Sequence, residues 1–407
     1  MPDEKKSFSV PRGTQDFMPE DMIRRNYVFA TIKDVFERFG FDPIETPAFE
    51  EWQLLAAKSG EAIKDEIYYF KDKSDRELGL RFDLTVPLAR IVATQQLAKP
   101  FRRYCIGRVW RYDKPGSGRK REFWQADVDI VGSSEAKADA ECIAAVCTVL
   151  EELGIDFTVR INNRKLMDAF LKSIGADAAE VFRSIDKLEK IGREGVEKEL
   201  SEKGIDSKKI SKILKFIESD LKTVKQYIKE SVEEINALLK ALKPYGLDKK
   251  IKVDMSFVRG LEYYTGLVFE IVSQGPSIAG GGRYDDLVKQ LGGEEVPATG
   301  ISIGIERIMD IAKIDAPKTI VDIYIATVSN VWNEAVKIAK KLRKKLNVEI
   351  DASGRGLSKQ LEYAGNKGIK KVIILGEKDL AEKQVTVRDM KTGEEKKIAL
   401  GRLVKEL

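Results

Sequence analysis

The stretch REFWQADVDIVG, residues 121–132, alternates two kinds of side chain. Successive side chains of a β-strand point to opposite faces, so the alternation predicts a strand with one polar face. That face carries Phe123, Gln125, Asp127 and Asp129, and the opposite face is mostly apolar. For a single strand, a solvent-facing sheet surface explains the pattern equally well.

Two earlier segments add acids and arginines to the same pattern. LRFDLTV is interpreted as a strand, and a second strand ends in WRYD. The residues expected to share a face are Arg81, Asp83 and Thr85 in the first strand and Arg111 and Asp113 in the second. Carboxylates can hold an ammonium group while a guanidinium faces a carboxylate or phosphate. Three such strands could therefore form the floor of a site for a small zwitterion and ATP.

Secondary-structure patterns divide the chain into three parts. Residues 1–163 and 251–316 are predicted to form one domain around an antiparallel meander. Residues 164–250 are rich in Lys and Glu with a helical pattern, which predicts a helical insertion. Strand and helix patterns alternate in residues 317–407, which predicts a separate small α/β domain.

Local signals predict where several elements begin and end. The helix over residues 21–39 is expected to end at Gly40, and a second helix is expected to have Ser133 or Ser134 as its N-cap. The glycines of AGGGRYDDL, residues 280–282, indicate a tight turn or a place where backbone approaches a ligand.

Composition restricts the chemistry. The chain of 407 residues contains no histidine, which excludes Ser-His-Asp and Cys-His catalysis and imidazole metal ligands. Three scattered cysteines favour neither a disulfide framework nor a zinc site. The sequence contains no P-loop and no GxGxxG motif, so bound phosphate would be held by side chains, chiefly Arg.

Charge and hydropathy bear on partners and location. The net charge of +5, from 71 basic and 66 acidic residues, is weak support for a polyanionic partner. A solvated Lys/Glu-rich surface, as in a thermophile, explains it equally well. We find neither a membrane-spanning apolar run nor a signal peptide, so a cytoplasmic protein without a membrane partner is expected.

Several motifs carry a specific resemblance. RVWRYD, a loop and REFWQADVDIVG resemble motif 2 of class II aminoacyl-tRNA synthetases, and ATGISIGIERI resembles motif 3. Residues 21–39 with GFDPIETPAFE resemble motif 1, which carries the dimer interface in this class. PRGTQDFMP, LRFDLTVPLAR, VRGLEYYTGLVFE and AGGGRYDDL together resemble the histidyl-tRNA synthetase family, with LRFDLTVPLAR similar to its archaeal and eukaryotic branch.

The resemblance covers essentially the whole chain and implies an α+β fold. Its parts would be a class II catalytic domain, in which helices flank an antiparallel sheet, a helical insertion and a C-terminal α/β anticodon-binding domain. The implied activity is activation of L-histidine by ATP, with Mg²⁺, to histidyl-adenylate and transfer to the 3′ end of tRNA(His), releasing pyrophosphate and AMP. A cytoplasmic homodimer is implied as well.

Roles for ATP binding follow from the resemblance residue by residue. Arg111 would contact the α-phosphate, and Asp113 the adenine edge. Arg119 would contact the outer phosphates, Phe123 would stack on adenine, and Arg307 would hold the γ-phosphate. Arg111 also counts as catalytic.

Roles for histidine binding follow in the same way. The residues implied for the ammonium group and substrate orientation are Asp83, Thr85, Gln125 and Asp129. Tyr264 and Tyr284 would recognise the imidazole, and Arg259, the second catalytic residue, would bridge the histidine carboxylate and the α-phosphate. The Mg²⁺ ligands are not assigned, and Asp127 is a suggestion.

Plainer interpretations stay open at this point. Arg259 could form a surface salt bridge, and Tyr264 could be a core aromatic whose neighbour Tyr263 points to the opposite face. The chain could be an inactive paralogue such as the regulatory subunit that partners ATP phosphoribosyltransferase, although those typically lack the C-terminal domain. A class II synthetase for glycine, threonine or proline is a further alternative.

Overall fold

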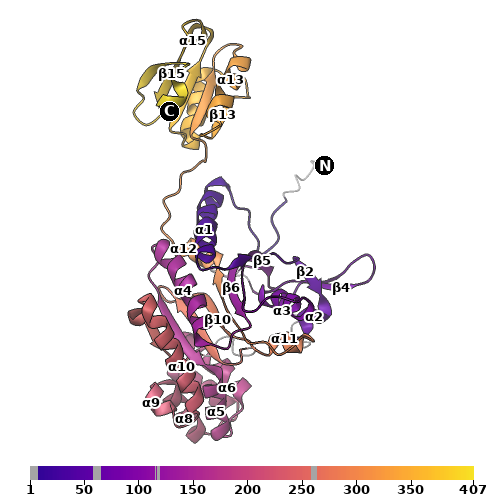
Figure 1. Cartoon of the computed structure of the whole chain (residues 1–407). Helices are drawn as coiled ribbons and strands as arrows, with labels where there is room; N and C mark the ends of the chain where they lie inside the picture. Colours follow the sequence, from indigo (N-terminus) through magenta and orange to yellow (C-terminus); the bar gives the residue numbers. More distant parts are fainter. Residues whose placement is uncertain (1–7, 58–65, 115, 117–119, 258–263) are drawn as a thin grey trace, which may run out of the picture. The chain divides into compact units, whose positions relative to one another are not determined.

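The computed structural model describes residues 8–57, 66–114, 116, 120–257 and 264–407. The chain divides into two compact units (Figure 1). The first unit comprises Met1–Asp16 and Val28–Lys313, and the second comprises Phe17–Tyr27 and Ile314–Leu407. Among the described residues, no helix is long and apolar enough to cross a membrane.

An eight-stranded sheet forms the centre of the first unit, in the order β1-β5-β6-β11-β10-β9-β7-β8. The outer pairings β1–β5 and β7–β8 are parallel, and all pairings between them are antiparallel. The strands are β1 Asp42–Pro43, β5 Phe101–Trp110, β6 Glu122–Val131, β7 Thr158–Asn163, β8 Ile251–Val253, β9 Leu267–Val272, β10 Ser277–Arg283 and β11 Ala298–Gly304. The predicted antiparallel sheet is confirmed.

Smaller elements flank this sheet. The strands β2 Phe49–Glu51, β4 Glu77–Leu80 and β3 Tyr69–Lys71 form a separate three-stranded sheet. The helices of the first unit outside the insertion are α1 Pro19–Arg38, whose first residues belong to the second unit, α2 Trp52–Ala56, α3 Thr85–Thr94, α4 Ala136–Glu152, α11 Leu287–Gln290 and α12 Ile305–Ile311. Helix α4 packs on β6 and β11 with a largely buried, alanine-rich surface.

Two predicted helix ends can be compared with the structure. Gly40 adopts a left-handed φ of 73° after α1, as expected for a C-cap glycine. The N-cap of α4 is Glu135, so the prediction of Ser133 or Ser134 is wrong. The reason is tertiary: Arg283 donates hydrogen bonds to the main-chain oxygens of Ser133 (3.1 Å) and Glu135 (2.9 Å), which fixes the chain before the helix.

Between β7 and β8 the chain is helical, as its Lys- and Glu-rich pattern predicts. The helices are α5 Arg164–Ser173, α6 Ala178–Ile185, α7 Leu188–Glu202, α8 Ser207–Ile217, α9 Leu221–Val224 and α10 Lys229–Leu242. Asn163 joins this part to the sheet: its side chain caps α5 at Lys165 N (3.0 Å) and donates to Glu234 of α10 (2.6 Å).

The second unit contains a five-stranded sheet in the order β13-β12-β14-β15-β16. Its strands are β12 Ile323–Thr327, β13 Val348–Ile350, β14 Lys371–Leu375, β15 Gln384–Asp389 and β16 Glu395–Ala399. Its helices are α13 Trp332–Leu342, α14 Leu357–Lys367, α15 Glu377–Ala381 and α16 Leu403–Glu406. The predicted alternation of strand and helix followed by a hairpin is confirmed.

The strand predicted for LRFDLTV is wrong after Leu80. Strand β4 ends there, and helix α3 begins at Thr85. The carboxylate of Asp83 accepts hydrogen bonds from the main-chain N–H groups of Thr85 (3.2 Å) and Val86 (3.0 Å), so it caps the helix start. Arg81 is buried and donates to the main-chain oxygen of Thr46 at 2.6 Å instead of joining a shared polar face.

Candidate active site

A row of residues on three neighbouring strands forms one end of the site's floor. Asp129 on β6 lies beside Arg103 on β5 and Gly300 on β11. Its carboxylate is 2.6 Å from Nη2 of the fully buried Arg103 and accepts a hydrogen bond from the Tyr284 hydroxyl at 2.5 Å. Burial lowers the pKa of Arg103, but the neighbouring carboxylates raise this pKa by more. The guanidinium therefore stays charged.

Gly300 makes room for that carboxylate. A Cβ at this position would lie 1.9 Å from Oδ1 of Asp129. Gly300 was not predicted as a site residue, although period two in ATGISIG places it on one face with Ser302 and Gly304. The available signal was the small residue at every second position of ATGISIG, which leaves room for the polar side chains of a neighbouring strand such as β6.

The next row contains Asp127 on β6, Ser302 on β11 and Gly280 on β10. Asp127 is 3% exposed, and its Oδ1 has no hydrogen-bond partner in the part of the chain that the structure describes. Burial raises the pKa of Asp127 to about 7, against the lowering effect of Arg103, and the nearby Asp129 raises it further. This oxygen is suited to accept a hydrogen bond from a cationic ligand.

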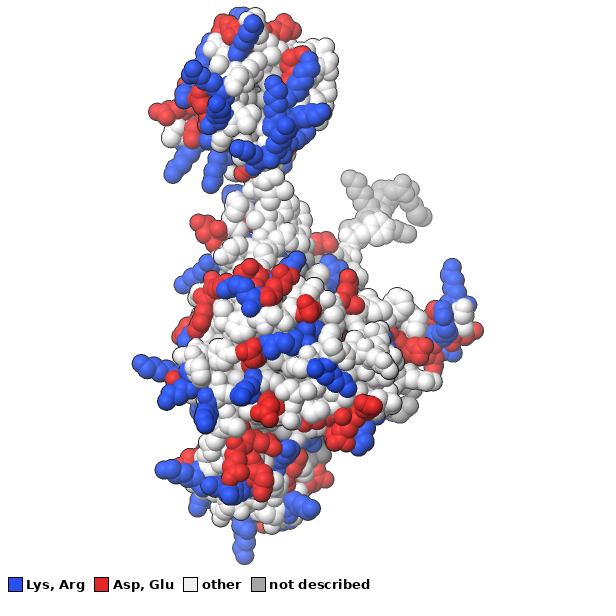
Figure 2. All heavy atoms as spheres, viewed as in Figure 1, with Lys and Arg blue, Asp and Glu red and all other residues white. Residues whose placement is uncertain are grey.

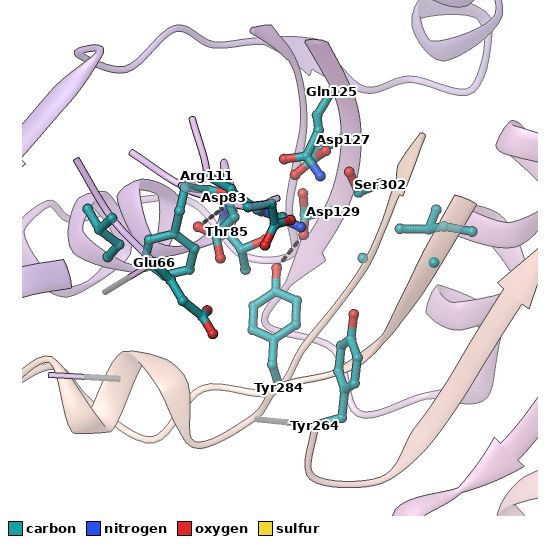
Figure 3. A pocket seen from close by; sticks show the side chains of 16 residues that line it. Glu66, Asp83, Thr85, Arg111, Gln125, Asp127, Asp129, Tyr264, Tyr284 and Ser302 are labelled. Carbon is teal, nitrogen blue, oxygen red and sulfur yellow. Dashed lines mark hydrogen bonds between the residues drawn. The ribbon is translucent and has the colours of Figure 1, made fainter. Parts of the chain in front are cut away.

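A cavity of about 310 Å³ lies over these two rows (Figure 3). Nine residues predicted for the site line it: Asp83, Thr85, Arg111, Asp113, Gln125, Asp127, Asp129, Tyr264 and Tyr284. In Figure 3 the two tyrosines stand side by side, with their hydroxyls toward the acidic rows. The cavity is also lined by Gly280, for which the sequence suggested a close approach to a ligand, and by residues that were not predicted: Glu66, Ile67, Phe82, Gly300, Ile301 and Ser302. We call this cavity the acidic cavity.

A second cavity of about 430 Å³ adjoins the first and shares five lining residues with it: Arg111, Asp113, Gln125, Gly280 and Ser302. It also has Lys120, Phe123, Glu306 and Arg307 in its wall, of which Phe123 and Arg307 were predicted. We call it the basic cavity, because Arg111, Lys120 and Arg307 face it against two carboxylates.

Arg111 stands where the two cavities meet. Its Nε donates to the main-chain oxygen of Phe82 at 2.9 Å, and its guanidinium lies 5.2 Å from the ring centroid of Phe123. Glu306 accepts a hydrogen bond from Trp124 N at 3.0 Å, which ties α12 to β6. The arrangement places a cationic fork and an aromatic face beside one another, as nucleotide binding requires.

Three further predictions have other outcomes. Arg119 and Arg259 lie outside the described residues. The glycines at positions 280–282 lie within strand β10, so the turn prediction is wrong, and Gly281 is packed against Gly300 O of the next strand. The alternative suggested for them, close approach to a ligand, fits Gly280, which lines both cavities.

Comparison with protein families gives this geometry a context. The family model of histidyl-tRNA synthetase matches residues 13–308. The chain belongs to the histidyl-tRNA synthetase family. A second model, described as an anticodon binding domain, matches residues 322–407. The chain is therefore an aminoacyl-tRNA synthetase that ligates histidine to tRNA with ATP, as the resemblance implied.

Histidyl-tRNA synthetase relatives span nearly the full chain. The histidine–tRNA ligases of Pyrococcus horikoshii and Nanoarchaeum equitans are each 40% identical, over 97% of this chain and 97% of theirs. The crystal structure of histidyl-tRNA synthetase from Nostoc sp. covers 99% of both chains with a TM-score of 0.84 and 31% identity. The predicted family, its archaeal-like branch and the class II fold are confirmed.

Proposed function

We propose that the acidic cavity binds histidine, that the basic cavity binds ATP, and that the two react where the cavities meet. The support is the division of charge: carboxylates dominate the wall of the first cavity, and Arg and Lys dominate the wall of the second. An ammonium group is stabilised by the former and phosphates by the latter.

Within the acidic cavity, Asp127 is the carboxylate we assign to direct contact with the ammonium group. Asp83 is engaged by the start of α3, and Asp129 by Arg103 and Tyr284. Asp127 Oδ1, by contrast, has no hydrogen-bond partner in the described residues. Asp83 and Asp129 then act at longer range, and Asp129 also fixes the Tyr284 hydroxyl.

The remaining roles stay as the family resemblance gives them. Gln125 and Thr85 orient the substrate, and Tyr264 and Tyr284 contact the imidazole. In the basic cavity Arg111 binds the α-phosphate, Asp113 and Phe123 hold the adenine, and Arg307 binds the γ-phosphate. Arg119 and Arg259 keep their proposed roles on the outer phosphates and the histidine carboxylate.

The first step needs no general base. The α-carboxyl group has a pKa of about 3.5 and is ionised at neutral pH, so it can attack the α-phosphorus directly. Its oxygen bonds to phosphorus as the bond to pyrophosphate breaks, which leaves histidyl-adenylate. Arg111 stabilises the charge that develops at phosphorus, and catalysis is otherwise positioning. A chain without histidine can perform this chemistry.

The basic cavity fits Mg²⁺ in its usual mode. Glu306 faces it, beside the Asp113 assigned to the adenine, and Mg²⁺ on nucleotides typically uses one or two carboxylates plus phosphate oxygens. When bound, the ion would neutralise phosphate charge. The earlier suggestion, Asp127, lies in the acidic cavity, where the ammonium group is the better ligand.

For the second step we propose that the terminal 3′-OH of tRNA(His) attacks the adenylate and that AMP leaves. Lys and Arg gather over the second unit (Figure 2). Helix α13 and the turn after it expose Lys337, Lys340, Lys341, Lys344 and Lys345. Such a ridge suits contacts with an RNA backbone, so tRNA binding should weaken as salt rises.

We assign residues 1–163 and 251–316 to the catalytic domain, 164–250 to the helical insertion and 317–407 to the anticodon-binding domain. We further propose a cytoplasmic homodimer. Its support is an exposed aromatic face on the three-stranded sheet, where Phe49 and Phe70 are 51% and 37% exposed with ring centroids 6.3 Å apart. Exposed apolar patches of this kind mark protein interfaces.

Histidine-dependent ATP–pyrophosphate exchange, with each of the twenty amino acids tested separately, checks the proposal. Exchange is expected with histidine alone, and Arg111→Ala should lower kcat/KM by roughly 100-fold or more, because a donor to the developing charge is lost. Arg108→Ala is the control: this exposed arginine precedes Arg111 by three residues and lines neither cavity, so exchange should stay within about threefold.

The other outcomes are decisive as well. Silence with every amino acid would favour the inactive regulatory paralogue, and exchange with a different amino acid would mean that the specificity motifs were misinterpreted. Arg111→Ala with normal exchange would contradict the assignment of the basic cavity to ATP.

A further inference from the structure

An N-terminal turn contacts the end of the loop between β5 and β6. In the turn Pro11–Thr14, the main-chain N–H and the hydroxyl of Thr14 both donate to Pro11 O, at 3.0 and 2.7 Å. Gly13 has a φ of +85°, and its carbonyl accepts a hydrogen bond from Arg121 N at 2.8 Å. The turn therefore reaches the residue immediately before β6.

Arg121 in turn joins the two ends of that loop. Its main-chain oxygen accepts from Arg111 N at 3.0 Å, and its Nε donates to Asp113 O at 3.1 Å. Its guanidinium lies 3.9 Å from the ring centroid of Tyr112. Arg121 is not among the residues that line the two cavities, yet it contacts three consecutive residues of which Arg111 and Asp113 line both.

The contact between Gly13 and Arg121 leaves no room for a side chain. A Cβ at Gly13 would lie 2.7 Å from Cγ of Arg121 and 2.9 Å from its Cβ and Cδ. These atoms form the stem that carries the guanidinium onto Tyr112. A larger residue at position 13 must therefore displace Arg121, and with it the main chain just after β5, where Arg111 and Asp113 lie beyond the end of the strand predicted for them.

We propose that Arg121, held in place by the turn Pro11–Thr14, is a positioning residue for ATP: it fixes Arg111 and Asp113 at the basic cavity. This inference rests on the proposed assignment of that cavity to ATP. The carboxylates at the base of the acidic cavity are fixed separately, since Asp129 is held by Arg103 and Tyr284. A displaced Arg121 should therefore affect ATP more than histidine.

The test is the KM for each substrate in ATP–pyrophosphate exchange by the full-length chain. Gly13→Ala should raise the KM for ATP roughly tenfold and the KM for histidine by less than about threefold, because the ATP contacts move and the acidic rows do not. Gly40→Ala is the matched control. Gly40 has a similar φ of +73° but no atom within 4 Å of the added Cβ, so this variant carries the backbone strain without the clash.

Substitutions of Arg121 test the other side of the contact. Arg121→Ala should raise the KM for ATP about as much as Gly13→Ala, and Arg121→Lys, which keeps the stem and the cation, should restore most of it. Because both changes disrupt one contact, the double variant should resemble Arg121→Ala alone. These variants carry the test if Gly13→Ala does not fold.

Two results would overturn the proposal: equal increases in both KM values, or Arg121→Ala with the wild-type KM for ATP. Gly13→Ala no worse than Gly40→Ala would also count against it. Arg111→Ala tests separately whether the basic cavity binds ATP. If Arg111→Ala impairs the use of ATP while the Arg121 variants do not, the cavity is assigned correctly and the positioning role is wrong.

Discussion

Strands β6 and β10 both border the two cavities but contribute in opposite ways. Strand β6 supplies functional side chains, namely Gln125, Asp127 and Asp129, whereas β10 supplies Gly280, which lines both cavities and leaves space above it. A ligand over this floor needs both, because charge is useful only where the ligand can approach it. The comparison predicts that damage to β6 alters electrostatics and that damage to β10 alters shape.

The largest effect should come from removing the guanidinium of Arg103, which lies on β5 beside Asp129 of β6. Arg103→Met leaves the buried carboxylate of Asp129 without its partner, which typically costs about 3–5 kcal/mol. The melting temperature of the first unit should fall by roughly 10 °C, as measured by thermal denaturation, and exchange activity should be lost.

Arg102→Met is the matched control on the same strand. Arg102 pairs with Glu141, but both side chains are about 30% exposed, so the loss should be about 1 kcal/mol or less. Adding Asp129→Asn to Arg103→Met should recover part of the lost stability, since the uncompensated charge is gone. Equal losses from Arg102→Met and Arg103→Met would show that the buried pair does not stabilise β6 as argued.

The two strands also differ in how far the sequence could predict them. Alternation was enough for β6, because a period of two places Asp127 and Asp129 on one face whatever the neighbours are. It could not show that Arg103, and not Arg102, faces them, since the choice depends on the register of β5 against β6. Register is a tertiary property, set by which faces are buried.

Glycines and short apolar segments were harder to interpret. A run of glycines usually marks a turn, but here Gly281 is required inside a strand because Gly300 O of the next strand occupies the space of a side chain. In LRFDLTV the alternation of polar and apolar residues predicted a strand. In the structure, Asp83 accepts hydrogen bonds from the first main-chain N–H groups of helix α3. For the glycines the deciding contact is distant in sequence, whereas for Asp83 it is local: the same carboxylate suits a strand face or a helix start, and alternation alone does not distinguish them.

The next effect in size tests β10. Gly281→Ala would place a Cβ 2.1 Å from Gly300 O, so the sheet must open, and we expect a loss of roughly 3 kcal/mol. Gly280→Ala meets no atom within 4 Å and should be neutral or up to about 1 kcal/mol more stable. Gly280→Val should fold normally but lose about tenfold or more in exchange activity, because its side chain enters the junction of the cavities.

Denaturation midpoints and exchange rates of the three variants decide this prediction. Full activity in Gly280→Val would mean that neither substrate passes over β10. A stable Gly281→Ala would show that β10 and β11 can separate at little cost.

The smallest effect, a pH dependence, concerns Asp127 alone. Its pKa of about 7 means that below this pH it is protonated and offers no charge to the ammonium group of histidine. The KM for histidine should therefore rise about tenfold from pH 8 to pH 6, since binding then requires loss of a proton. Asp127→Asn should have a high KM for histidine that does not show this rise between pH 8 and pH 6. The imidazole of the substrate titrates in the same range in both proteins, so the difference between them isolates Asp127.

The stability of the protein should fall as pH rises, although histidine binding becomes tighter over the same range. An Asp whose pKa is raised by folding destabilises the native state increasingly as pH rises from its ordinary value toward 7, because the native state holds the proton longer. Asp127→Asn should therefore raise the melting temperature by several °C at pH 8 and by less at pH 5. If the variant were no more stable at pH 8 than wild type, Asp127 would be ionised without cost in the free protein. Its charge would then be compensated by a group other than the substrate, and the contrast between a charged β6 and an open β10 would no longer explain how histidine is held.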